Sequence, residues 1–283
     1  VSDVDQDVFY KGSSDVIHTW MTAKLAETVS TVNDHFSKFR VSDAMTAIYK
    51  LIWGDFCSWY LEWMKPAYGS PIPSADLVKI KANFDSMLRL LHPFMPFITE
   101  ELWHNLSESR DKMLIVSEWP ASSGQITDES SVSDVKWLQM LVTNLRSVRA
   151  DMNIPPSKMA PLLVLSTSLD ERLNLFADQL KPLARVSGIS LSEVVPRGAL
   201  QTVVEGVTYA IPLDGLLDKT VERDRLNKEI SKIEVEISKI DNKLSNHAFV
   251  SNAPEKVVVL QKDRKLSYLN ELEKLNLALV NLN

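Results

Sequence analysis

The sequence predicts a mainly α-helical protein built from a helical bundle, a small α/β connector and an antiparallel coiled-coil hairpin. Three periodicities predict these parts. Apolar residues recur every three or four positions through most of residues 15–151, which is typical of amphipathic helices. Residues 160–213 hold short Val- and Ile-rich runs separated by glycines, which is typical of strands. Residues 226–279 carry apolar residues at alternating spacings of four and three, which is the seam of a coiled coil.

Three long helices are expected in the bundle. The first covers residues 15–39, and the second begins near Ser42, a residue type that caps helices. The second helix ends at Pro66 and is apolar on so much of its circumference that we expect it at the centre of the bundle. Ser74 can cap the third helix, which carries its own apolar stripe.

Residues 91–103 read LHPFMPFITEELW and predict a corner between two helices. Pro93 and Pro96 cannot continue the preceding helix, because proline lacks an N–H and disfavours helical geometry in the residue before it. Thr99 is expected to cap the next helix, with two glutamates in its first turn. The large apolar side chains of the corner are expected in the core, namely Phe94, Phe97, Leu102 and Trp103.

The remaining elements follow from changes of period along the chain. An extended stretch at 112–120 and a polar loop at 121–132 precede a helix at 133–151. The connector is then expected to contain a strand at 160–166, a helix at 169–187, and strands at 188–195, 199–205 and 207–213, with a hairpin turn at Glu205-Gly206.

Two heptad helices are expected in the C-terminal part. The seam of the first helix comprises Leu226, Ile230, Ile233, Ile237, Ile240 and Leu244, and that of the second comprises Tyr268, Leu272, Leu275 and Leu279. Residues 245–255 read SNHAFVSNAPE and break the pattern. At 1.5 Å per residue, the resulting hairpin would be roughly 40 Å long.

The charge of the chain is unevenly distributed. The whole chain holds 31 basic and 37 acidic residues, a net charge of −6. Residues 216–283 contain 12 of the basic and 11 of the acidic residues, which leaves 19 basic and 26 acidic residues elsewhere. Because binding to phosphate needs only a local basic face, this balance neither supports nor excludes a nucleic-acid partner.

Few residues of the chain suggest chemistry of their own. The single Cys57 cannot form an internal disulfide or a multi-cysteine zinc site, and its aromatic neighbours predict an inert core thiol. The five histidines are scattered, and His92 before a proline is expected to be structural. No phosphate-binding loop or metal-ligand cluster is visible, so we expect no catalytic residue and no metal site. No apolar stretch reaches the ~18 residues of a membrane span, so no membrane partner is expected.

Four segments carry a resemblance to a known family. The helix HFSKFRVSDAMTAIYKLIWGDFCSWYLEWMKP at 35–66, the corner at 91–103 and the connector RSVRADMNIPPSK at 146–158 resemble the helical anticodon-binding domain of the class I aminoacyl-tRNA synthetases for valine, isoleucine and leucine. The break SNHAFVSNAPEKVV, which follows LDGLLD and a heptad helix, resembles the coiled-coil arm of valyl-tRNA synthetases. Isoleucine enzymes usually end in a cysteine-rich zinc module, and leucine enzymes lack the long heptad hairpin. The resemblance is therefore to the C-terminal portion of the valine-specific branch.

This resemblance implies a division into an anticodon-binding domain with a connector helix at 1–158, an α/β subdomain at 159–215 and a tRNA-binding arm at 216–283. The first helix of the family's bundle, with its aromatic and arginines for the anticodon, has no match before residue 15 and is expected to be missing. The implied function is to hold tRNA(Val) for aminoacylation, with ATP and Mg²⁺ used by N-terminal domains of the full enzyme and no cofactor in this segment. We expect a cytoplasmic monomer.

The resemblance also implies contact residues for tRNA. On the anticodon side these are Leu61 as an apolar wall near a base, Lys65 beside it, and Arg146 and Arg149 on the connector helix. On the arm they are Lys243 before the helix break and Arg264 with Lys265 after it. The class I signatures His-x-Gly-His and KMSKS are absent, so this segment alone is predicted to be non-catalytic.

Two other functions remain open from the sequence. The chain could be a freestanding RNA-binding protein derived from a synthetase, which the presence or absence of an upstream nucleotide-binding domain would decide. It could also be a scaffold whose heptads pair with another protein, which titration with tRNA against a heptad peptide would decide.

Overall fold

The structure is a computed structural model that divides into two compact units, Val1–Trp137 and Leu138–Asn283. The residues that it describes are 12–107, 110, 112–121, 128–213, 215–216, 219–246 and 254–282. Residues 122–127 of the predicted polar loop and residues 247–253 of the predicted helix break lie outside the described residues.

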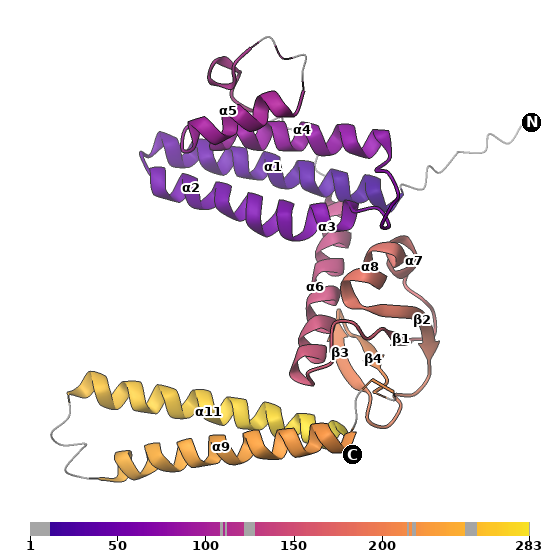
Figure 1. Cartoon of the computed structure of the whole chain (residues 1–283), viewed down its shortest axis with the longest axis vertical. Helices are drawn as coiled ribbons and strands as arrows, with labels where there is room; N and C mark the ends of the chain where they lie inside the picture. The colour runs from indigo at the N-terminus through magenta and orange to yellow at the C-terminus, as the bar shows by residue number, and fades with distance from the viewer. Residues whose placement is uncertain are drawn as a thin grey trace, which may run out of the picture. The chain divides into compact units, whose positions relative to one another are not determined.

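The first unit is helical. Its elements are α1 (Ser13–Ser37), α2 (Val41–Tyr49), η1 (Lys50–Tyr60), α3 (Leu61–Met64), α4 (Ser74–Leu91), α5 (Pro96–Asn105) and the 3-10 turn η2 (Leu114–Val116). Helices α1, α2 and α4 lie side by side (Figure 1) and bury the apolar residues that repeat along them. Helix α6 (Glu129–Asp151) contains the point at which the two units divide.

The second predicted helix is continuous but changes its winding. Elements α2, η1 and α3 follow one another without a break, and η1 is a π-helix. Buried positions step from Ile48 to Leu51 and then by five residues to Phe56, because each turn of a π-helix holds more residues than an α-turn. This shift leaves Tyr49 and Trp53 more than half exposed, so only part of the apolar circumference is central.

The proline corner is built differently from the prediction. Pro96 occupies the first turn of α5, where its missing N–H costs nothing, and Met95 is the N-cap residue. Thr99 lies one turn further in, is fully buried, and its hydroxyl donates to the carbonyl of Met95 at 2.8 Å. His92 Nδ1 lies 2.7 Å from the same hydroxyl. The predicted N-cap role of Thr99 is therefore wrong, and the threonine instead ties the corner together from inside.

The four apolar side chains of the corner differ in how deeply they are buried. Trp103 is 6% exposed, and its indole N–H donates to the carbonyl of Lys112 at 3.1 Å. Phe94 is half-buried and stacks on Phe36. Phe97 is 90% exposed and Leu102 is 36% exposed, so their predicted places in the core are wrong. Both residues follow Pro96, and the earlier start of α5 turns their side chains away from the core.

The second unit contains a four-stranded mixed sheet. Its strands are β1 (Ala160–Leu165), β2 (Val186–Ser192), β3 (Leu200–Val204) and β4 (Val207–Ile211), in the order β2-β1-β4-β3. Strands β1 and β2 are parallel and joined through α7 (Glu171–Leu175) and α8 (Ala177–Ala184), whereas β4 is antiparallel to β1 and β3. The turn between β3 and β4 is Glu205-Gly206, with φ of 48° and 81°, which is typical of a tight hairpin.

Two long helices, α9 (Lys219–Ser245) and α11 (Glu255–Leu282), complete the chain. They pack against each other and run in opposite directions (Figure 1). Leu226, Ile233 and Ile240, spaced by seven residues on the predicted seam, are buried. No helix among the described residues is long and apolar enough to cross a membrane.

Candidate nucleic-acid interface

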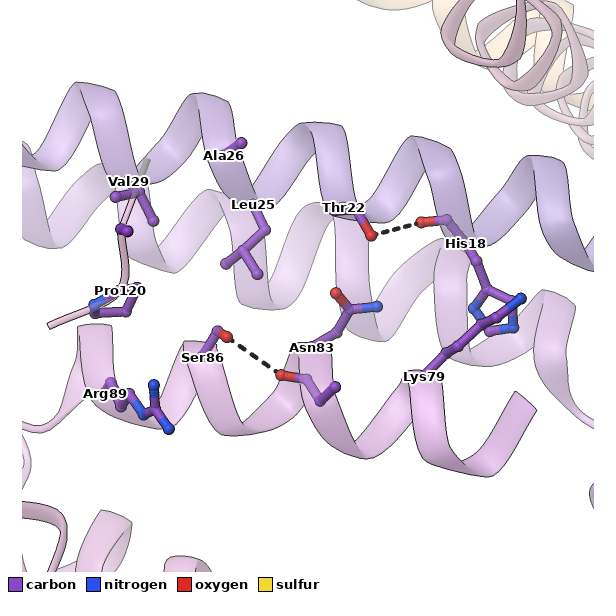
Figure 2. A pocket seen from close by; sticks show the side chains of 12 residues that line it. His18, Thr22, Leu25, Ala26, Val29, Lys79, Asn83, Ser86, Arg89 and Pro120 are labelled. Atoms are coloured by element: carbon purple, nitrogen blue, oxygen red, sulfur yellow. Dashed lines mark hydrogen bonds between the residues drawn. The ribbon is translucent and has the colours of Figure 1, made fainter. Parts of the chain in front are cut away.

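A pocket of about 360 Å³ lies between α1 and α4 (Figure 2). Two cations line it, Lys79 and Arg89, together with polar groups of Asn83 and Ser86. Lys79 pairs with Asp15 at 2.7 Å, whereas the Nε of Arg89 is buried with no hydrogen-bond partner among the described residues. Cations attract phosphate, and apolar walls pack on a base. The lining therefore combines cationic and polar groups with apolar side chains.

A buried chain of hydrogen bonds forms one end of this pocket. Asn83 donates to the phenol oxygen of Tyr60 at 3.1 Å, so the phenol proton is directed to His18 Nδ1, 2.7 Å away. His18 Nε2 then donates to Asp76 at 3.0 Å. Burial raises the pKa of Tyr60 to about 12, and burial also lowers the pKa of His18 below its usual value. Both shifts favour neutral side chains, and a neutral His18 fits the direction of this chain.

The predicted anticodon contacts on α3 lie on its partly exposed side. Leu61 is half-buried at the start of the helix. Lys65 is exposed just after the helix and pairs with Glu62, one turn earlier. A surface pair of this kind is weak, so Lys65 keeps the ability to exchange its partner for a phosphate.

The two predicted arginines of α6 differ in exposure. Arg146 is exposed, and its Nε donates to the carbonyl of Leu183 at 2.8 Å. Arg149 is only 5% exposed, and its Nη2 donates to the carbonyl of Lys158 at 2.5 Å. Burial, with the nearby charge of Arg185, lowers the pKa of Arg149. The interior position of Arg149 corrects the expectation that it lies on a surface open to RNA.

On the two long helices, the three predicted cations fall into two groups. Lys243 and Arg264 are exposed. The pKa of Glu236 on α9 is lowered, chiefly by a hydrogen bond from Lys239 and also by the charges of Arg264 and Lys243. Cations of both helices therefore act on one carboxylate, and we call Lys239, Lys243 and Arg264 the basic surface. Lys265 instead pairs with Asp241 across the two helices at 2.5 Å.

Comparison with protein families gives two matches. Residues 18–164 match the anticodon-binding domain of tRNA ligases, and residues 218–283 match the tRNA-binding arm of valyl-tRNA synthetases. The first match spans more than half of the chain. The chain belongs to the anticodon-binding domain family of tRNA ligases.

The curated proteins that this chain is similar to are valine–tRNA ligases. The ligase of Rhizobium meliloti is 36% identical over 277 residues, which cover 95% of this chain and 29% of that protein. The ligase of Agrobacterium fabrum is 37% identical over 271 residues (93% and 28%), and that of Christiangramia forsetii is 34% identical over 264 residues (93% and 30%). The chain thus spans about three-tenths of the length of these relatives. It corresponds to the C-terminal portion of valine–tRNA ligase and holds its tRNA-binding domains, not its catalytic domain.

Sequence reasoning missed the pocket of this anticodon-binding domain. Lys79, Asn83 and Ser86 are spaced by four and three residues on α4, so they share one helix face. Polar residues at that spacing on a bundle helix were the available signal. No such signal marks Arg89, which lies among leucines, or the inward position of Arg149. Among the described residues, no cluster of three or more metal-ligating side chains occurs.

Proposed function

We propose that this chain holds tRNA(Val) while a valine–tRNA ligase charges it. The observation that carries the proposal is the order of two tRNA-binding families along one chain, the second of them specific to valyl-tRNA synthetases. In the full enzyme, ATP and Mg²⁺ would serve the activation of valine outside this segment. A cytoplasmic location fits a part in protein synthesis. The monomeric state predicted from the sequence stays a prediction.

The proposed division of labour follows three parts. Residues 1–158 would bind the anticodon side of the tRNA, residues 159–215 would connect, and residues 216–283 would form the arm. We propose that α9 and α11 make an antiparallel coiled coil, which the buried residues at heptad spacing support. A stiff two-helix arm suits a contact far from the anticodon, because tRNA is held largely by its backbone and shape.

Lys243 and Arg264 are proposed to make the main contacts of the arm with tRNA. They stand on different helices, both are exposed, and both act on Glu236, so one RNA surface can meet both side chains. Phosphate would compete with Glu236 for these charges, and an arginine can also stack on an exposed base. Lys265 contributes by joining the helices through Asp241 rather than by reaching RNA.

On the anticodon side, the proposal rests on α3 and the pocket between α1 and α4. Leu61 offers a half-buried apolar surface, and Lys65 offers a cation whose present partner is a surface carboxylate. Arg146 is exposed beside the connector and can meet phosphate. Single-stranded bases are read by stacking and by contacts to their edges. The pocket offers apolar side chains for stacking and polar side chains for edge contacts.

The test is a titration of labelled tRNA(Val) with the chain, followed by fluorescence anisotropy at several salt concentrations. The variant K243A/R264A should bind more weakly, and its slope of log affinity against log salt should be shallower by about 1.4–1.8, from two lost phosphate contacts. The control R223A/K274A removes two exposed cations from the same helices, far from the basic surface. It should bind like the unaltered chain. Equal losses in both variants would contradict a specific grip.

A further inference from the structure

Large apolar side chains are exposed at one end of the helical bundle. Two of them belong to the turn between α1 and α2 and to the first residue of α2, namely Phe39 and Val41. Three more lie at the start of α5, namely Met95, Phe97 and Ile98. All five are 45–92% exposed, and the two phenylalanines are the most exposed of them, at 92% and 90%. We call these five residues the end patch.

The two halves of the end patch lie beside each other. Phe36, near the end of α1, stacks on Phe94 of the proline corner, with their ring centroids 6.1 Å apart. Each of these rings is followed three residues later by an exposed phenylalanine, Phe39 or Phe97. Figure 1 shows the turn between α1 and α2 at the same end of the bundle as the start of α5. Single exposed apolar residues are ordinary on a protein surface, but a group of large ones in one place marks an interaction site.

The backbone of Phe39 also indicates a functional surface. Its φ is 56°, in the left-handed region that bulky side chains rarely adopt. The ring packs on little of the fold, since it is 92% exposed, and glycine or asparagine would end α1 with less strain. Strain of this kind concentrates at functional sites, so a contact outside the bundle is a reason for a phenylalanine at this position.

The end patch and the predicted anticodon contacts lie at opposite ends of the bundle. Elements α2, η1 and α3 form one continuous rod that begins at Val41 and ends at Met64. Val41 belongs to the end patch, whereas Leu61 and Lys65 lie at the other end of the rod. At up to 1.5 Å per residue, the two ends are roughly 30–35 Å apart. Anticodon bases bound at Leu61 and Lys65 would therefore not cover the end patch.

We propose that the end patch docks on the part of the valine–tRNA ligase that precedes this chain. The inference rests on the proposed function, in which that part holds the catalytic domain. This chain matches 28–30% of the length of the ligases described above and corresponds to their C-terminal portion, so most of such a polypeptide precedes it. Contacts between domains of one polypeptide bury about 600–1,500 Å². The buried centres of protein interfaces are apolar and enriched in aromatic residues and methionine, as the end patch is.

Docking at the end patch would give the rod a defined role. One end would rest on the preceding part of the ligase, and the other would present Leu61 and Lys65 to the anticodon. Because the rod is one continuous helix, it would hold these two places at a fixed separation. A loosened contact would therefore impair the full-length ligase without weakening the binding of tRNA by this chain alone.

The test compares the oxidation of two methionines by hydrogen peroxide, in this chain alone and in the full-length ligase, with peptide mass spectrometry as the readout. Met95 belongs to the end patch, and Met159 directly precedes β1. They are 45% and 44% exposed, so they should oxidise at similar rates in this chain. In the full-length ligase, Met95 should oxidise at least about fivefold more slowly because its exposure is lost. Met159 should oxidise at an unchanged rate.

The variant F39D/F97D should return the oxidation of Met95 in the full-length ligase to its rate in this chain alone. Both substitutions suit their backbones, because aspartate tolerates the left-handed conformation and a carboxylate is favourable in the first turn of α5. The variant chain should therefore keep its circular dichroism, its melting temperature and its affinity for tRNA(Val). The control Tyr68→Asp alters a fully exposed aromatic residue outside the end patch and should leave Met95 protected.

Four results would overturn the proposal. The first is equal oxidation of Met95 in this chain and in the full-length ligase. The second is protection in the full-length ligase that survives F39D/F97D. Slower oxidation of Met95 when tRNA(Val) is added to this chain alone would assign the end patch to RNA, and slower oxidation as this chain is concentrated would assign it to a second copy. Failure of the proposed function would show itself differently, as a lack of tRNA binding by the unaltered chain.

Discussion

Replacing Tyr60 by phenylalanine removes one oxygen atom from the centre of the helical bundle. The ring would keep its packing on Phe56, whose centroid lies 5.5 Å away. The lost oxygen is the acceptor for Asn83 and the donor to His18, and these two side chains are 7% and 4% exposed. The phenol of Tyr60 is itself fully buried, so both side chains lose a hydrogen-bond partner inside the bundle.

The expected cost follows from the two groups left without partners. A buried polar group without a hydrogen bond costs about 1–3 kcal/mol, so Tyr60→Phe should lower the free energy of unfolding by about 2–6 kcal/mol. For a unit of this size, that loss corresponds to a fall in melting temperature of about 10 °C.

Tryptophan fluorescence provides the assay, because all seven tryptophans of the chain lie in the first unit. The emission therefore reports unfolding of the bundle without contribution from the sheet or the arm. Tyr49→Phe is the matched control, since Tyr49 is 56% exposed and surface changes stay within about 0.5 kcal/mol. If Tyr60→Phe and Tyr49→Phe melt alike, the buried hydrogen-bond chain does not hold the bundle together.

Three further predictions concern pH, the arm and the corner. The pKa of His18 is lower in the folded state than its value of about 6.5 in the unfolded chain, so the contribution of His18 to the free energy of unfolding is present above pH 6.5 and is lost as the pH falls below it. Melting temperatures recorded by fluorescence should therefore fall between about pH 7 and pH 5. The fall should be smaller in His18→Gln. Ile240→Asp places a charge at a position that is 4% exposed, so it should cost at least about 3 kcal/mol and remove helical circular dichroism while the fluorescence transition stays in place. Trp103→Ala should destabilise the bundle by about 3–5 kcal/mol. Phe97→Ser should change the free energy of unfolding by no more than about 0.5 kcal/mol, because Phe97 is 90% exposed. Chemical denaturation measures both.

The sequence predicted those elements whose signals are local. Periodicity marked the long helices, and Glu205-Gly206 marked a hairpin turn that the structure confirms. The helix predicted at 169–187 ends instead at Ala184, because Arg185 takes a left-handed conformation and β2 begins directly after it. The predicted extended stretch at 112–120 contains the 3-10 turn η2 for which the sequence carries no start signal.

Features that depend on distant partners were not predictable. Nothing near Lys265 in the sequence shows that Asp241 will lie beside it, because that pairing depends on the register of two helices. In the sequence, Arg149 resembles any helix-surface arginine; only the folded chain brings its guanidinium to the carbonyl of Lys158. The π-helical segment likewise has no local sequence signature, and it moved the buried stripe by one residue between Leu51 and Phe56.

The central claim is that one chain holds tRNA(Val) at two places, the anticodon side and the tip region of the arm. Hydroxyl-radical footprinting of tRNA(Val) with the chain tests it most directly. We predict protection in the anticodon arm and, separately, at the outer corner of the tRNA, with the second footprint lost in K243A/R264A and the first retained. Uniform protection along the whole backbone, or no protection at saturating protein, would contradict the account.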